Sequence, residues 1–140
     1  MKKLLFVDTN FFCAIHNKTD SLHNKAQKVL PLLFSYTLAT SNFVLLEAFT
    51  IILQRASRRQ AMIFKEEIYQ PDAYKIIWIR QEQEEEIWNI FTSITDKDFS
   101  YVDASILAVM QKEKIKHLLS FDKGFKPLQK KFSFTLIGAE

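Results

Sequence analysis

The chain has 140 residues, 48% of them apolar, and its 19 basic and 16 acidic residues give it a net charge of +3. This length and apolar content fit one folded domain over residues 1–140 and exclude a disordered chain, while the lone Cys13 excludes an internal disulfide and favours a cytoplasmic protein. No apolar run approaches the roughly 18 residues of a membrane span, so we expect no membrane partner.

Short apolar runs alternate with segments of helical apolar spacing along the whole chain. Continuous apolar runs indicate strands, and apolar residues that recur every three or four positions indicate helices. In chain order we expect a strand at Lys3–Val7, a helix capped within Asp8–Asn10, a helix over Leu22–Phe34, a strand at Tyr36–Ala39, a helix capped by Ser41 or Asn42 that runs to about Arg55, a helix over Arg58–Tyr69, a strand at Tyr74–Ile79, helices over Gln81–Ser93 and Tyr101–Lys114, and strands at His117–Phe121 and Phe132–Ile137. Strands that alternate with helices predict an α/β fold whose mainly parallel sheet is covered by helices on both faces.

The helix expected over Gln81–Ser93 is amphipathic. We expect its apolar side chains, including Trp88, to face the core, and the acidic run Glu82–Glu86 to form a solvated face. Trp78 is likewise expected in the core. The alternative is that these aromatic residues are exposed and serve a homodimer.

Four carboxylates, those of Asp8, Glu47, Asp103 and Asp122, lie against or inside apolar stretches. Moving one carboxylate out of water is costly, and gathering several adds repulsion between like charges. Ligands of open α/β sheets bind beyond the carboxyl ends of the strands, and right-handed crossovers bring helix starts to the same edge. We therefore expect the four to converge around a hard cation, and an all-oxygen ligand set favours Mg²⁺ or Mn²⁺ over zinc.

Each of these acids also has an ordinary structural interpretation. Asp8 fits a helix cap, Asp103 is favoured near a helix N-terminus by the macrodipole, and Asp122 fits a turn. Glu47 fits an ordinary residue of a helix surface. Four such roles at one edge of one sheet are the less economical account.

Basic residues gather in two clusters. These are either solvated faces or an electrostatic track for a phosphate backbone. The clusters are Arg55, Arg58 and Arg59 in the middle of the chain, and Lys123, Lys126, Lys130 and Lys131 near its end.

Four short motifs together resemble the PIN-domain ribonucleases, notably the VapC-like toxins. They are Phe6–Asn10 (FVDTN), Ser41–Glu47 (SNFVLLE), Val102–Ala108 (VDASILA) and Leu119–Phe125 (LSFDKGF). The resemblance covers essentially the whole chain, although each motif is weak by itself. It implies a three-layer α/β/α sandwich with a mainly parallel central sheet, and cleavage of RNA that depends on Mg²⁺ or Mn²⁺.

The resemblance also implies roles for individual residues. Asp8, Glu47, Asp103 and Asp122 match metal ligands of the family, acting directly or through water. The matched polar residues that would orient carboxylates or substrate are Thr9, Asn10 and Ser120. The family often has Thr where this chain has Ser120, and the hydroxyl is kept.

The resulting hypothesis is an endoribonuclease that cleaves single-stranded or structured RNA with a metal-activated water. The resemblance further implies that it is a toxin silenced by a small antitoxin, whose cationic side chain plugs the acidic pocket. A haloacid-dehalogenase-like phosphatase is disfavoured because Asn10 stands where its second Asp is needed, and a receiver domain because Thr9 follows Asp8. A non-catalytic RNA- or protein-binding module remains the alternative.

Overall fold

A five-stranded sheet runs through the computed structural model of the protein, which describes residues 1–139. The strand order is β3-β2-β1-β4-β5, and each neighbouring pair is parallel. The strands are β1 (Lys3–Val7), β2 (Tyr36–Ser41), β3 (Lys75–Ile77), β4 (His117–Leu119) and β5 (Thr135–Ile137). Because β1 is central, its last three residues, Leu5 to Val7, are fully buried.

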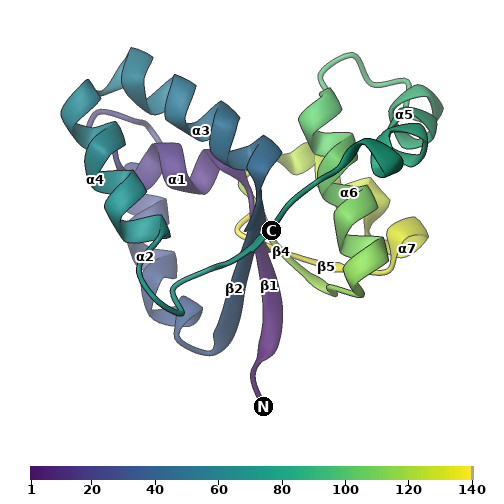
Figure 1. Cartoon of the computed structure of the whole chain (residues 1–140), viewed down its shortest axis with the longest axis horizontal. Coiled ribbons are helices and arrows are strands. Elements are labelled where there is room, and N and C mark those ends of the chain that lie inside the picture. Colours follow the sequence, from purple (N-terminus) through teal and green to yellow (C-terminus); the bar gives the residue numbers. More distant parts are fainter. Residues whose placement is uncertain (140) are drawn as a thin grey trace.

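Helices cover both faces of this sheet. Figure 1 shows α1 to α4 on one side and α5 to α7 on the other, which confirms the predicted α/β/α sandwich. The helices are α1 (Thr9–Ile15), α2 (His23–Leu33), α3 (Asn42–Arg55), α4 (Arg58–Ile68), α5 (Glu84–Ser93), α6 (Tyr101–Glu113) and α7 (Gln129–Phe132), with 3-10 helices η1 (Gln81–Gln83) and η2 (Lys123–Leu128). None of the helices within residues 1–139 is both long and apolar enough to cross a membrane.

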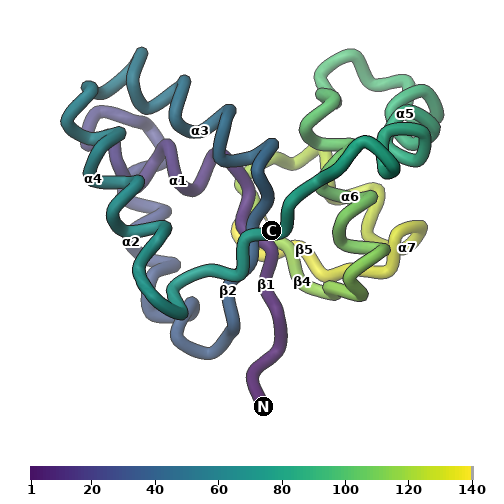
Figure 2. Tube along the Cα trace, in the orientation of Figure 1, coloured from purple at the N-terminus to yellow at the C-terminus, as the bar shows by residue number. Residues whose placement is uncertain are grey.

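Polar residues at the strand ends also begin the helices that follow. The Asp8 carboxylate caps α1 by accepting a hydrogen bond from the Thr9 backbone N–H at 2.7 Å, and the Ser41 hydroxyl caps α3 through the Val44 N–H at 3.2 Å. Each cap satisfies a backbone donor that the helix leaves free. The turns from β1 into α1 and from β2 into α3 therefore lie at one end of the sheet, as the tube in Figure 2 shows.

Several predicted boundaries differ from the structure. The strand expected over Tyr74–Ile79 is limited to Lys75–Ile77, because the side chain of Asn42 hydrogen-bonds both backbone groups of Ile79. The strand expected from Phe132 begins at Thr135, because Ser133 adopts a left-handed backbone that ends α7. The segment after Asp122, where no helix was predicted, forms η2 and α7.

The prediction that Trp78 and Trp88 lie in the core is wrong. Trp78 is 58% exposed and Trp88 is 55% exposed. Trp78 directly follows β3, which is an edge strand, so neighbouring residues bury its side chain only in part. The buried stripe of α5 is made by Ile87 and Ile90, and Trp88 lies about 100° around the helix from Ile87.

We expect Asn42→Ala to destabilise the protein by about 1–3 kcal/mol, because buried Ile79 would lose a hydrogen-bond partner on both its N–H and its C=O. Urea unfolding measures this. Asn42→Asp is the matched control: it keeps the acceptor for the Ile79 N–H and should lose less. Equal stability of Asn42→Ala and the unsubstituted protein would contradict this account of the end of β3.

Candidate functional site

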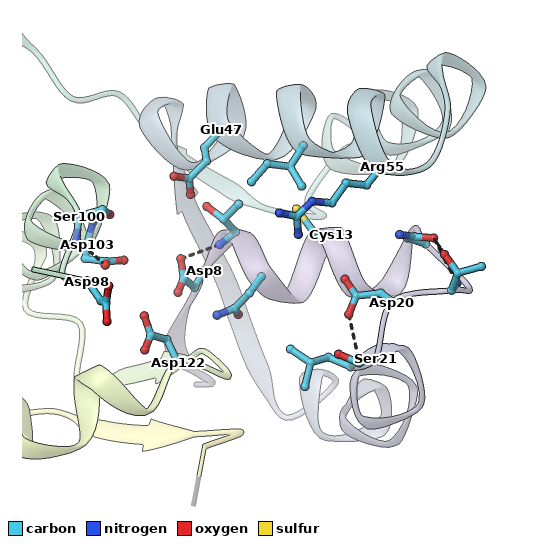
Figure 3. Close-up of a pocket in the computed structure, with 16 residues that line it drawn as sticks. Asp8, Cys13, Asp20, Ser21, Glu47, Arg55, Asp98, Ser100, Asp103 and Asp122 are labelled. Carbon is cyan, nitrogen blue, oxygen red and sulfur yellow. Dashed lines mark hydrogen bonds between the residues drawn. The ribbon is translucent and has the colours of Figure 1, made fainter.

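The four carboxylates singled out in the sequence line one pocket of about 580 Å³. Asp8 comes from the end of β1, Glu47 from the second turn of α3, Asp103 from the first turn of α6, and Asp122 from the segment after β4. Figure 3 shows their carboxylates pointing toward a shared space. Thr9 and Asn10 also line the pocket. The four acids therefore line one pocket, and their role as ligands of a shared cation stays a prediction.

Ser120 holds the centre of this site together. Its hydroxyl is fully buried and donates to Asp8 Oδ2 at 2.7 Å. The Ser120 hydroxyl oxygen also accepts from Asn10 Nδ2 at 3.2 Å and from the Asp122 backbone N–H at 3.1 Å. Asn10 Oδ1 accepts from the Phe121 N–H at 3.1 Å. These bonds fix the carboxylate of Asp8 against the end of β4.

Asp103 is held by a reciprocal cap at the start of α6. Its Oδ2 accepts from the Ser100 N–H at 2.8 Å, and the Ser100 hydroxyl accepts from the Asp103 N–H at 3.0 Å. The capping interpretation of Asp103 is thus correct as far as it goes. The other oxygen of its carboxylate is not used by this cap, and the residue also lines the pocket.

Asp122 is positioned by a tight turn. Its Oδ1 accepts from the Gly124 N–H at 2.8 Å. A Cβ at position 124 would lie 3.1 Å from the same oxygen, so any larger residue there would press on the carboxylate. Asp122 is therefore a turn residue as well as a pocket residue, and the two interpretations of its role coexist.

Burial raises the pKa of Asp8 to about 7, and the nearby carboxylates of Asp103 and Glu47 raise it further against the hydrogen bonds from Ser120 and Thr9. Burial also raises the pKa of Asp103 to about 6, with contributions in the same direction from Asp122 and Glu47. Repulsion between like charges thus links all four acids. Within residues 1–139, no lysine or arginine forms an ion pair with any of the four acids.

The pocket contains further polar residues outside the predicted set of site residues. Asp98 and Ser100 line it on the α6 side, while Asp20 and Ser21 line it beyond α1. Asp98 lies in the segment between α5 and α6. Its polar sequence surroundings gave no sign that the turn folds back to the strand ends.

Of the two basic clusters, only Arg55 lines this pocket. Arg58 and Arg59 begin α4, and the four lysines near the chain end are exposed on η2 and α7. The predicted basic track is therefore represented at the pocket by a single cation within the described residues.

The donors around the pocket suit a hard divalent cation. The acids supply only oxygen, and two of them resist ionisation unless a positive charge is added. Thr9 lines the pocket, and its buried hydroxyl oxygen has no hydrogen-bond partner among residues 1–139. Within the same residues, no three Asp, Glu, His or Cys side chains are already gathered tightly enough to hold one ion.

A family model of the PIN domain matches residues 5–131, which is most of the chain. The chain belongs to the PIN-domain family. It is 30% identical over 122 residues to the Mycobacterium tuberculosis protein named 23S rRNA-specific endonuclease VapC20, and the match covers 87% of this chain and 92% of VapC20.

Two solved structures share the fold. The crystal structure of M. tuberculosis VapC20, described as a toxin that cleaves the sarcin–ricin loop, matches with a TM-score of 0.78 at 27% identity over 88% of this chain and 93% of that one. VapBC2 of Rickettsia felis, crystallised with a DNA fragment from its promoter, matches with a TM-score of 0.68 at 19% identity over 96% and 97% of the two chains. The second likeness supports the fold alone.

We expect the metal-free protein to lose stability as pH rises from about 4 to about 7. The folded state keeps the proton of Asp8 up to a pKa of about 7, whereas the unfolded chain releases it near 3.8, so the native state binds more protons across this window. One pKa unit corresponds to about 1.4 kcal/mol, so the loss should reach a few kcal/mol. Urea unfolding in EDTA across this pH range measures it.

Asp8→Asn should flatten this profile and be more stable than the unsubstituted protein above pH 7. Asp72→Asn is the matched control, because Asp72 is exposed and outside the pocket, and it should leave the profile unchanged. A profile of the unsubstituted protein that rises between pH 4 and 7 would refute the electrostatic account.

Proposed function

We propose that this PIN-domain protein is a divalent-metal-dependent endoribonuclease and the toxin of a toxin–antitoxin pair. The observation that carries the proposal is the meeting of Asp8, Glu47, Asp103 and Asp122 in one pocket at the carboxyl edge of the sheet. The family membership and the named activity of VapC20 support it. Ribosomal RNA is accordingly the first substrate to test.

In this proposal the four acids hold the ions. When bound, Mg²⁺ or Mn²⁺ would stabilise the negative charge that develops as a phosphodiester is hydrolysed. Asp8 and Asp103, the two most buried acids, would make the interactions most dependent on the cation, since their raised pKa values disfavour ionisation without it. Glu47 and Asp122, which are more exposed, would face the substrate side.

The polar residues would orient this acid set. Ser120 and Asn10 fix Asp8 through the hydrogen bonds described above, and their loss would leave its carboxylate free to rotate. Such supporting contacts commonly account for 10–100-fold in metal affinity or activity, by the order of magnitude known for other sites. Thr9, which also lines the pocket, would be a further polar residue beside Asp8.

The alternatives receive less support. In a haloacid-dehalogenase-like phosphatase the position of Asn10 would carry a general acid, but here its amide is engaged with Ser120 and Phe121. A module that merely binds RNA or protein has no need of buried acids with raised pKa values, which destabilise the empty fold. A cytoplasmic location and a homodimer stay predictions.

We expect Asp8→Asn to reduce Mg²⁺- or Mn²⁺-dependent cleavage of ribosomal RNA by at least about 100-fold, because the loss of one anionic ligand removes several kcal/mol of charge stabilisation. Gel analysis of end-labelled fragments measures the cleavage. Asp72→Asn should cleave like the unsubstituted protein. The proposal fails if Asp8→Asn and the unsubstituted protein cut equally, or if neither cuts when freed of any bound partner.

We expect expression of the protein alone to arrest bacterial growth, and co-expression of a small protein encoded by the adjoining reading frame to restore it. The acidic pocket suits a partner that inserts a cationic side chain, as the toxin resemblance implies. Co-purification from the same cells would identify the complex. Growth arrest that persists beside every adjoining product, with no co-purifying protein, would remove the antitoxin part of the proposal.

A further inference from the structure

Arg55 is the only cation among the side chains that line the acidic pocket. The same pocket is lined by six carboxylates, those of Asp8, Asp20, Glu47, Asp98, Asp103 and Asp122. A polyanion that enters such a pocket is repelled everywhere except at bound metal and at this one guanidinium. The position of Arg55 relative to the acids is therefore informative about how substrate enters.

Arg55 lies on the same strip of α3 as Glu47. Glu47, Ile51 and Arg55 are four residues apart in turn, and all three line the pocket. Residues at this spacing lie one above another on a helix. Side chains on a helix also lean toward its N-terminus. Figure 3 shows the Arg55 side chain reaching back along α3, so that its guanidinium lies over Cys13 and toward the carboxylates.

The guanidinium is not committed to a carboxylate of the protein. Within residues 1–139 the ion pairs are His16 with Glu67 and Lys75 with Glu113, and neither involves Arg55. Arg55 lowers the pKa of buried Cys13, against the larger, opposite effect of burial. An arginine used only to neutralise the pocket would be expected to pair with one of the acids.

We propose that Arg55 binds a backbone phosphate of the RNA next to the scissile one. This inference rests on the proposed function, because it takes RNA as the substrate. A guanidinium presents a fork of donors that matches two phosphate oxygens. Held at the far end of the strip from Glu47, it orients the strand so that the following phosphodiester lies among the four acids. Arg55 is thus a positioning residue, distinct from the acids.

The decisive experiment measures binding separately from cleavage. A fluorescently labelled single-stranded RNA is titrated with the Asp8→Asn protein and with the same protein carrying Arg55→Gln, at several salt concentrations. We expect Arg55→Gln to weaken binding about five- to tenfold and to lower the slope of log affinity against log salt by about 0.7, the value for one phosphate contact on a single strand. Arg55→Lys should keep the slope and recover part of the affinity.

Arg59→Gln is the matched control, because Arg59 is exposed in the first turn of α4 and does not line the pocket. It should change neither quantity. In the cleavage-competent protein, Arg55→Gln should raise KM about tenfold and leave kcat within about twofold. A purely structural role would instead lower thermal stability without changing the salt slope.

The outcomes separate this inference from the proposed function. If the unsubstituted protein cleaves RNA and Arg55→Gln binds and cleaves like Arg59→Gln, the phosphate role of Arg55 is overturned and the nuclease stands. If Arg55→Gln weakens only binding of the protein partner, the residue serves that partner and the inference is equally overturned. If RNA is bound through Arg55 but never cleaved, the phosphate site stands and the nuclease falls.

Discussion

The site depends on one electrostatic conflict: carboxylates are held beside one another at a place that water scarcely reaches. Asp8 is 4% exposed and Asp103 is 9% exposed, and the Asp103 carboxylate raises the pKa of Asp8. The fold does not relieve this conflict with a lysine or arginine of its own at the centre. A cation from solution is left to do so, and binding it converts a destabilising cluster into a stabilising one.

The conflict persists only because the surrounding backbone removes the freedom to escape it. Asp8 caps α1, Asp103 belongs to a reciprocal cap at the start of α6, and Asp122 accepts from the turn that it begins. Each of these acids therefore has at least one oxygen held by a hydrogen bond while the residue still lines the pocket. The structural and functional interpretations of these residues, which compete when the sequence is read alone, turn out to describe one arrangement.

Much of the architecture could be predicted because the spacing of apolar residues and the capping residues indicate the same strands and helices along the chain. The failures occur where tertiary contacts decide. The end of β3 depends on the amide of Asn42, which is distant in sequence. Helices η2 and α7 form in a lysine-rich stretch whose sequence is typical of a turn. The exposure of Trp78 and Trp88 was missed because hydrophobicity alone does not tell which side of an edge strand or helix is covered.

Asp98 and Arg55 were not assigned to the site, since only the folded chain shows which polar residues face the pocket. The assignment of individual acids as ligands stays a prediction, as does the single-domain extent.

Helix α3 fixes the distance between Glu47 and Arg55 in the pocket. Its first turn is fastened to the sheet through Ser41 and Asn42, and it carries Glu47 and Arg55 on one rigid rod. Eight residues at 1.5 Å each separate their Cα atoms by about 12 Å along the axis. Main-chain geometry sets this distance, so movements of the surrounding loops would leave the separation of Glu47 and Arg55 unchanged.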